Sequence, residues 1–271
     1  MNILVCVKQV PDSEAIYTID EASQWVRTGS GTEFKMNRYD ECAVEEAVRI
    51  KETFPDISID VLSIGPSSVD TVIRRAIGMG GDNGIHVATG GDEFYDPFTL
   101  ATWIAAMARS STYDLIFTGV MSEDMMQGRV GPLTAELLSL PCATAVVSES
   151  LALDRNTIRV EREVEGGYRE TLELKLPALL TIQTGINQPR YPSLSNLMRA
   201  NKLSINKIQT GKLDESVKQQ VVKQVKFPQN IRNGIFLKGS AEKKAEQLLE
   251  ILERRSLLTI RDVVSLRKSR Y

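Results

Sequence analysis

Apolar residues in the first half of the chain follow two periods that alternate along the sequence. Short β-branched runs, typical of strands buried on both faces, are separated by segments with apolar residues at helical spacing. The predicted strands are residues 3–7, 57–63, 84–88 and 114–118. The predicted helices are residues 40–52, 67–79 and 98–108, followed by one that has Pro132 in its first turn. This alternation favours a parallel sheet with crossover helices on both faces.

After Pro141 the pattern becomes one of alternating strands separated by turn residues. These predicted strands are residues 143–148, 157–163, 168–175 and 178–181. Because the turns between them are short, we expect hairpins that extend the sheet in antiparallel fashion. Residues 1–186 are therefore predicted to form one α/β domain.

The C-terminal part, residues 187–271, has a different texture. Residues 187–228 show little periodicity and many polar side chains, and so long an irregular stretch is unusual inside a compact domain. We therefore expect an extended arm lying on another polypeptide. A helix is predicted over residues 241–254, with leucines on one face, and the basic segment 256–271 is left without an assigned role.

Composition excludes several function classes. The chain has 271 residues and a formal net charge of -2, which gives no reason to expect a nucleic acid or an anionic membrane as partner. The three cysteines form no CxxC pair, and the one histidine, His86, is interpreted as structural, so no metal site is expected. No signal peptide and no run of about 18 apolar residues is recognised, which favours a cytoplasmic location.

Candidate binding chemistry follows the strands of the predicted sheet. Ligands of open parallel sheets bind beyond the carboxyl ends of the strands, and here these ends carry Cys6, Ile64 and Gly119. The loop of residues 120–130 then leads into a helix, and free N–H groups at such a helix start favour an anion such as a nucleotide phosphate.

Two interpretations of this loop remain open. Gly119, Gly128 and Gly131 either bring the backbone close to a phosphate or permit tight turns. Neither GxGxxG nor a Walker A motif is present, which argues against a standard dinucleotide or phosphoryl-transfer site. Glu123 and Asp124 would suit a ribose hydroxyl, but nothing supports them as a catalytic acid and base, and no catalytic residue is assigned.

Five segments resemble, in order, the β subunit of the electron transfer flavoproteins. They are LVCVKQVPD (residues 4–12), NRYDECAVEEAVRIK (37–51), GMGGDNGIHV (78–87), VEREVEGGYRETLELKLPALLT (160–181) and NQPRYPSLSNLM (187–198). The resemblance implies a flavodoxin-like or adenine-nucleotide α-hydrolase-like α/β fold. It also implies an electron carrier subunit, and not an enzyme that completes a reaction alone.

The resemblance further implies two cofactors. This chain would bind a structural AMP, and a larger α subunit would carry most of the FAD-binding surface. The implied AMP-binding residues are Cys6, Asn37, Arg38, Tyr39, Asp40, Ile64, Gly119, Ser122, Glu123, Asp124, Gln127, Gly128, Arg129, Val130 and Gly131.

The resemblance also implies where partners bind. Glu163 would help to orient the FAD domain of the α subunit, unless it is an ordinary solvated charge. A loop with Leu194 as its apolar anchor would recognise an acyl-CoA dehydrogenase or related flavoenzyme, unless Leu194 packs on its own domain. The partner-binding residues are then Glu163, Tyr191, Leu194, Asn196, Leu197 and Met198. A dense lysine run that often continues this loop in the family is absent after Met198, so electrostatic steering should be weaker.

Three functions are compatible with the sequence. The first is a carrier that passes electrons from the dehydrogenase to a membrane quinone oxidoreductase. The second is a flavin-bifurcating complex with a second FAD in place of AMP and NADH as the electron source. Met125 and Met126 would crowd that flavin, which favours AMP. The third is a stand-alone adenine-nucleotide-binding protein.

Overall fold

The computed structural model describes residues 1–20, 25–91, 94–213, 219–228 and 234–257. By its internal contacts the chain consists of two units, Met1–Val225 and Lys226–Tyr271. The first unit contains the sheet and the helices that cover it, and the second contains one described helix. The contact boundary therefore lies well after residue 186, where the sequence places the end of the α/β domain.

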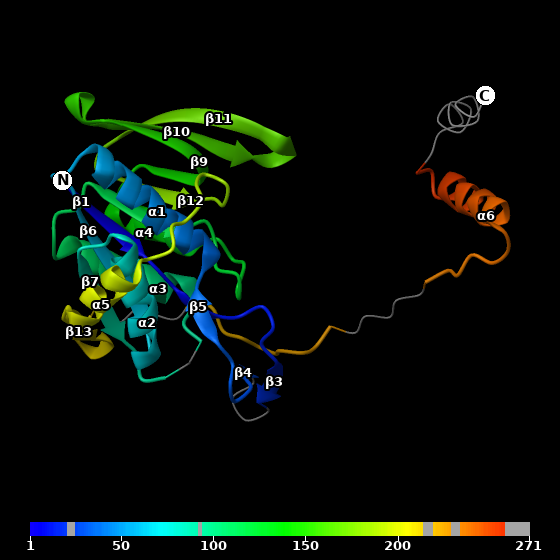
Figure 1. The fold of residues 1–271 in the computed structure, drawn as a ribbon, viewed down its shortest axis with the longest axis horizontal. Coiled ribbons are helices and arrows are strands. Elements are labelled where there is room, and N and C mark those ends of the chain that lie inside the picture. Colours follow the sequence, from blue (N-terminus) through cyan, green and yellow to red (C-terminus); the bar gives the residue numbers. More distant parts are fainter. Residues whose placement is uncertain (21–24, 92–93, 214–218, 229–233, 258–271) are drawn as a thin grey trace. The chain divides into compact units, whose positions relative to one another are not determined.

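Within the described residues, the first unit is built on a nine-stranded sheet (Figure 1). Its strand order is β11-β10-β9-β12-β8-β1-β6-β7-β13. The four strands predicted in the first half of the chain are confirmed as β1 (Asn2–Cys6), β6 (Ser58–Gly65), β7 (Asn83–Ala88) and β8 (Leu115–Gly119). They pair in parallel, β12 pairs in parallel with β8 and β9, and β13 pairs in parallel with β7. The predicted α/β class is confirmed.

The hairpin extension is confirmed for three strands and wrong for the fourth. β9 (Cys142–Ala152), β10 (Thr157–Val164) and β11 (Tyr168–Lys175) pair in antiparallel fashion across the short 3-10 turns η2 (Leu153–Arg155) and η3 (Glu165–Gly167). β12 (Ala178–Ile182) instead lies between β8 and β9 and is parallel to both. All five of its residues are buried, and such a continuous apolar run indicates a strand covered on both faces.

The expected arm after residue 187 is also wrong for much of its length. The segment forms α5 (Leu194–Lys202) and the edge strand β13 (Ile205–Gln209), which pairs in parallel with β7, followed by the 3-10 turn η4 (Thr210–Lys212). Ser193 caps α5, since its Oγ accepts a hydrogen bond from the N–H of Asn196 at 3.2 Å. Both elements are too short for a period to stand out from the polar residues around them.

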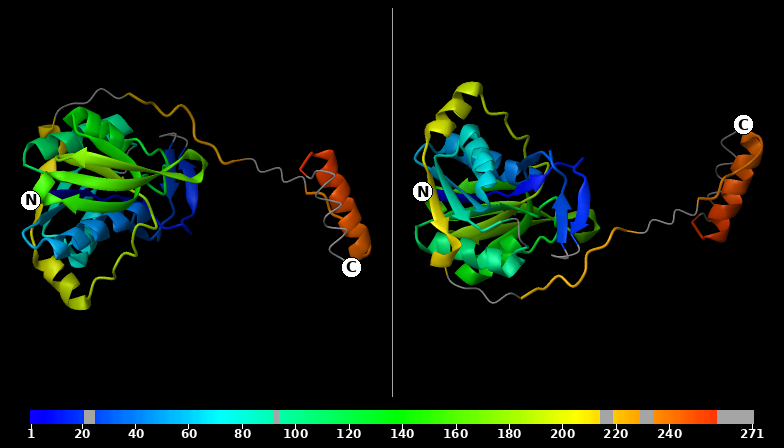
Figure 2. Two further views of the ribbon diagram at one scale, coloured as in Figure 1. Left: turned by 90° about the horizontal axis from the view of Figure 1, so that it is seen from above. Right: turned by 90° about the horizontal axis from the view of Figure 1, so that it is seen from below.

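Helices cover both faces of the sheet (Figure 2). On one face lie α1 (Arg38–Thr53), α2 (Asp70–Met79), which follows the 3-10 turn η1 (Ser67–Val69), and α5. On the other lie α3 (Pro97–Arg109) and α4 (Val130–Leu138). Two separate clusters of buried apolar side chains correspond to these two faces. The predicted helices are thus confirmed, with ends that differ by a few residues.

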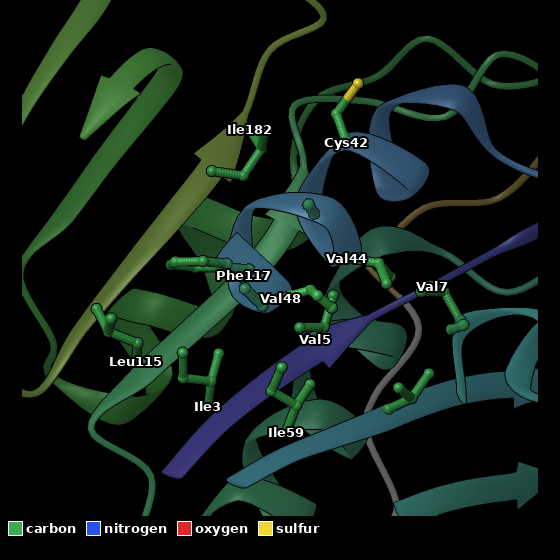
Figure 3. Close-up of a cluster of buried hydrophobic side chains, with 14 of the residues drawn as sticks. Ile3, Val5, Val7, Cys42, Val44, Val48, Ile59, Leu115, Phe117 and Ile182 are labelled. Atoms are coloured by element: carbon green, nitrogen blue, oxygen red, sulfur yellow. The ribbon is translucent and has the colours of Figure 1, made fainter. Parts of the chain in front are cut away.

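The larger cluster joins α1 to the middle of the sheet (Figure 3). Val44 and Val48 of α1 face Val5 of β1 and Phe117 of β8, and all four side chains are buried. Burying a side chain of this size contributes about 1.5–3 kcal/mol, so this contact fixes the position of α1 on the strands. The start of α1 is thereby held near the carboxyl ends of β1 and β8.

Two small ribbons were not predicted from the sequence. β2 (Gln9–Pro11) pairs with β5 (Phe34–Met36), and β3 (Tyr17–Asp20) pairs with β4 (Trp25–Thr28), both in antiparallel fashion. Trp25 contacts Phe94, with ring centroids 5.0 Å apart. Strands of three or four residues are too short to give a clear alternating pattern.

The second unit contains α6 (Ala241–Arg254), which has the bounds that the sequence predicts. Ser240 caps it, and its leucine face is not buried by the described residues of the chain. The basic residues Arg261, Arg267, Lys268 and Arg270 lie outside the described residues. In the part of the chain that the structure describes, no helix is long and apolar enough to cross a membrane.

Candidate functional site

The carboxyl ends of three neighbouring strands meet at one edge of the sheet. β8, β1 and β6 are adjacent, so their terminal residues Gly119, Cys6 and Ile64–Gly65 lie side by side. The start of α1, from Asn37 to Asp40, lies against the same edge through its hydrogen bonds. The residues that the sequence assigns to a nucleotide are therefore brought together from several parts of the chain.

Asp40 is the buried centre of this edge. Its carboxylate accepts hydrogen bonds from the N–H of Lys8 at 2.7 Å and from the N–H of Gly119 at 2.9 Å. The residue is only 5% exposed. Burial raises the pKa of Asp40 to about 7, against the opposing effect of these backbone donors. The carboxylate thus ties together α1, the end of β1 and the end of β8.

Close packing explains two of the glycines. A Cβ on Gly119 would collide with the Asp40 carboxylate and would lie 2.6 Å from Cβ of Tyr39. A Cβ on Gly131 would lie 2.5 Å from Cγ2 of Thr181 and 2.8 Å from Oγ1 of Thr118. Of the three glycines Gly119, Gly128 and Gly131, Gly128 is the one with a positive φ, 61°, which a tight turn requires. Packing is therefore sufficient to require glycine at positions 119 and 131, whatever the loop binds.

The acidic loop is folded onto the start of α1 by its own hydrogen bonds. Asn37 donates from Nδ2 to the carbonyl of Met121 at 2.9 Å and accepts at Oδ1 from the N–H of Glu123 at 3.1 Å. Lys8 Nζ forms an ion pair with Asp124 at 2.6 Å and contacts Ser122 Oγ at 3.3 Å. Glu123 accepts from the N–H of Arg38 at 3.4 Å. Both acids thus take part in holding the loop in place.

The end of the loop offers unsatisfied hydrogen-bonding capacity. Oε1 of Gln127 is buried and has no hydrogen-bond partner among the described residues. No side chain of the described ranges caps α4 at Arg129, and an anion at such a helix start is stabilised by backbone N–H groups. A buried acceptor beside an uncapped helix start is suited to a ligand that carries both a donor and a negative charge.

A cavity of about 670 Å³ adjoins this helix start. It is lined by Gly128, Arg129, Pro132 and Leu133, by the start of α3 from Asp96 to Phe98, and by Gln219 and Gln220. This volume lies in the range of small-molecule sites. Of the residues predicted to contact a nucleotide, only Gly128 and Arg129 line it.

The remaining predicted residues differ in accessibility. The half-buried residues are Tyr39, Ile64, Gln127 and Val130. Burial, together with the nearby Asp40, raises the pKa of the Cys6 thiol. Of the two methionines expected to crowd a second flavin, Met126 is 71% exposed and Met125 is half-buried, and the expectation stays a prediction. In the described residues no group of three or more His, Cys, Asp or Glu is arranged to hold a metal ion.

His86 lies behind the strand-end edge. It is 1% exposed, its Nε2 is 2.9 Å from the carbonyl oxygen of Gly65, and its Nδ1 is 2.8 Å from Oδ1 of Asp70. These contacts join β7 to the end of β6 and to α2. They agree with the structural role that the sequence assigns to this histidine.

The predicted partner-binding residues form a second group, on and before α5. Tyr191, Leu194 and Met198 are 87%, 75% and 56% exposed, so Leu194 does not pack on its own domain. Asn196 is exposed, whereas Leu197 is half-buried and points toward α2, where its Cδ2 lies near Gly78. Glu163 is exposed on β10, apart from α5 in the sheet order, and accepts a hydrogen bond from Gln183 Nε2 at 3.1 Å.

Sequence reasoning missed several residues that organise these two groups. No role was predicted for Lys8, and the binding of Asn187 and Arg190 to glutamates of α1 was not anticipated. The signal was present in the two adjacent acids Glu45 and Glu46, which lie on a helix face whose neighbours are apolar. Buried acids require partners, and those partners come from the segment before α5.

Comparison with known proteins finds similarity along most of the chain. The family described as "Electron transfer flavoprotein domain" matches residues 24–213. A mitochondrial electron transfer flavoprotein subunit beta of Arabidopsis thaliana is 35% identical over 89% of this chain and 95% of its own length. Subunits of the same name from Mus musculus and Bacillus subtilis are 37% identical over 82% of this chain and 30% identical over 93%, and the matches cover 86% and 97% of their own lengths.

Proposed function

The chain belongs to the electron transfer flavoprotein family, among the β subunits, and from this premise we propose that it pairs with an α subunit and holds AMP at its strand-end edge. In this proposal the heterodimer accepts electrons from an acyl-CoA dehydrogenase or a similar flavoenzyme. It then delivers them to a membrane quinone oxidoreductase. The chain alone completes no reaction.

The observation that carries the AMP assignment is the buried Oε1 of Gln127, which has no hydrogen-bond partner in the described part of the chain, beside the start of α4, which no described side chain caps. An adenylate supplies what both groups need, because its amino or hydroxyl groups donate to an acceptor and its phosphate accepts from backbone N–H groups. Cys6, Ile64 and Gly119 border the same edge from the strands. The residues present therefore fit an adenine nucleotide.

The chain's own residues organise the site without performing chemistry. Asp40 fixes the ends of β1 and β8 relative to α1, and Lys8 and Asn37 fix the loop. When bound, FAD supplies the one-electron and two-electron chemistry, which the protein positions and tunes. Glu163 is exposed on β10 and accepts a hydrogen bond from Gln183 within this chain. Its role toward the FAD domain of an α subunit is part of the proposal.

Two surfaces support the proposed partners. The exposed side chains of Tyr191, Leu194 and Met198 offer apolar anchors for the dehydrogenase, because a few buried apolar residues dominate small interfaces. The leucine face of α6 is not covered by described residues and would pack on the α subunit. The partner-binding role of residues 187–271 is part of the proposal, and part of this range lies in the first unit.

Nucleotide content of the purified heterodimer tests the proposal. We expect one AMP and one FAD per heterodimer, released by denaturation and measured by chromatography. Two FAD and no AMP would instead indicate the bifurcating complex, with NADH as the electron source. If no adenine nucleotide is present, and the isolated chain is soluble and monodisperse without an α subunit, the assignment as a carrier subunit is wrong.

A further inference from the structure

Residues 187–190, called here the anchor segment, bind the side chains of three glutamates on α1. Asn187 Nδ2 donates to Glu46 Oε2 at 2.7 Å. Arg190 binds Glu45 through its backbone N–H at 3.0 Å, through Nε at 2.9 Å and through Nη2 at 3.0 Å. Its Nη1 also binds Glu52 at 2.6 Å. The anchor segment therefore lies along α1 over more than one helical turn.

The geometry at Arg190 is specific to a guanidinium. Glu45 is only 5% exposed, and a carboxylate so buried destabilises the fold unless its oxygens are hydrogen-bonded. Arg190 contacts both oxygens of Glu45 and both oxygens of Glu52. A planar fork can bind two carboxylates in this way, whereas a lysine ammonium binds as a point charge.

The exposed anchors follow Arg190 directly in the chain. Tyr191 is the next residue, and the guanidinium of Arg75 lies 5.1 Å from the centroid of its ring. Pro192 and Leu197 then pack on α2 at Gly78, where a Cβ would lie 3.2 Å and 3.0 Å from them. Tyr191, Leu194 and Met198, called here the docking face, are thus presented on a segment that is held on both sides.

The far end of α5 is held in a similar way. Arg74 Nη1 donates to the carbonyl of Ala200 at 2.6 Å and to that of Leu203 at 3.3 Å. These carbonyls lie at the C-terminal end of α5, where that of Ala200 also accepts a hydrogen bond from the N–H of Leu203 at 3.3 Å. Arg190 and Arg74 therefore hold the two ends of one unit, and the docking face lies between them.

We propose that Arg190, through Glu45 and Glu52, is a positioning residue for electron transfer, because it fixes the docking face before the dehydrogenase binds. This inference rests on the proposed function. A docking face held in its binding conformation loses less conformational entropy on association than one that must first be ordered. Loosening the anchor segment therefore weakens the encounter with the dehydrogenase, while the strand-end edge, which is held at the start of α1, keeps its nucleotide.

The test compares Arg190→Lys with Arg199→Lys in the intact heterodimer. Arg199 is an exposed arginine on α5 with no ion pair among the described residues, so the same substitution there serves as the matched control. Electrons are supplied by a purified acyl-CoA dehydrogenase reduced by its acyl-CoA substrate. The KM for the heterodimer and kcat are measured separately, together with FAD and AMP content and hydrogen exchange of residues 187–202.

For Arg190→Lys we expect KM to rise by about tenfold, kcat to change by less than about twofold, and exchange of residues 187–202 to become faster. Arg199→Lys should leave all of these unchanged. Glu52→Gln weakens only the exposed ion pair of Arg190 and leaves the buried pair with Glu45 intact, so the protein should fold normally. It should raise KM by about twofold to threefold.

Three results would overturn the proposal. Faster exchange with an unchanged KM would make the clamp purely structural, and unchanged exchange would mean that Arg190 does not hold the segment. A rise in KM for Arg199→Lys equal to that for Arg190→Lys would show that the effect is not specific to the contacts of Arg190 with Glu45 and Glu52. Absence of any transfer with the unaltered heterodimer would refute the proposed function itself, which is a distinguishable outcome.

Discussion

The strand-end edge and the docking face are both held by α1, but by different kinds of contact. At the strand ends, Asp40 accepts hydrogen bonds from two backbone N–H groups, and Gly119 leaves no space for a Cβ. Before α5, the partly exposed side chain of Arg190 reaches the buried carboxylate of Glu45 and the exposed carboxylate of Glu52. Backbone contacts tolerate almost no change of residue, whereas side-chain ion pairs tolerate partial substitution. The two regions should therefore respond to mutation with very different amplitudes.

The largest effect is expected for Gly119→Ala. The added Cβ collides with the Asp40 carboxylate and with Tyr39, so the start of α1 must move or the end of β8 must shift. Overpacking at a buried position of this kind costs about 3 kcal/mol of the free energy of unfolding. Chemical denaturation measures this loss, and AMP content of the heterodimer should fall with it.

Gly211→Ala is the matched control for that substitution. A Cβ on Gly211 meets no atom within 4 Å, so stability and AMP content should stay unchanged. If Gly119→Ala were tolerated as well as Gly211→Ala, the strand-end edge would be no more rigid than the surface, and the contrast between the two regions would disappear.

How much the sequence predicted follows the same contrast. The strand ends were found because parallel strands and their glycines obey rules of backbone geometry, which a single sequence displays. The position of β12 was missed because an apolar run of five residues does not specify whether its partners are parallel. The helix α5 and its attachment to α1 were missed because they depend on side-chain pairs far apart in sequence, such as Arg190 and Glu45. No periodic pattern records such pairs.

Asp40→Asn should give the next largest effect. At pH 5 the folded Asp40 is protonated, but both of its oxygens keep lone pairs that can accept from Lys8 and Gly119, whereas the NH₂ group of asparagine cannot accept and its single amide oxygen serves only one of the two N–H groups. One buried backbone N–H is then left without a partner, which costs about 2 kcal/mol at pH 5. The measurement is the free energy of unfolding from denaturant titrations.

The cost should become smaller as the pH rises. The pKa of Asp40 is raised from 3.8 to about 7, so between these pH values the folded unaltered protein holds a proton that the unfolded chain has released. Its free energy of unfolding therefore falls as the pH rises through this window. The asparagine variant lacks this loss, and the difference between the two proteins should narrow by pH 8. A constant difference from pH 5 to pH 8 would show that Asp40 does not titrate in this range.

Leu194→Ala probes the other region. The side chain is 75% exposed, so stability and cofactor content should not change, while electron transfer from the dehydrogenase should fall about tenfold, or about 1.4 kcal/mol. Leu153→Ala, at another exposed leucine in η2, is the control and should transfer electrons normally. An unchanged rate for Leu194→Ala would remove this residue from the docking face.

The smallest effect is expected for Glu149→Gln. This variant tests whether a titrating group also lies beside Glu46, the residue of α1 that binds the anchor segment. Glu149 of β9 is raised in pKa from 4.5 to about 7 by burial and by the neighbouring carboxylate of Glu46, which also binds Asn187. The folded protein therefore retains a proton on Glu149 between about pH 4.5 and pH 7 and loses stability as the pH rises through that window. Glutamine stays neutral and can donate to Glu46, so the variant should be more stable than the unaltered protein by about 1 kcal/mol at pH 8 and nearly equal to it at pH 5.

Glu173→Gln, at an exposed residue of β11, should show no such pH-dependent gain in the same thermal unfolding series. An equal gain in stability for Glu149→Gln at pH 5 and pH 8 would mean that Glu149 does not titrate in this range. Asp40 would then be the principal titrating group that distinguishes the two regions.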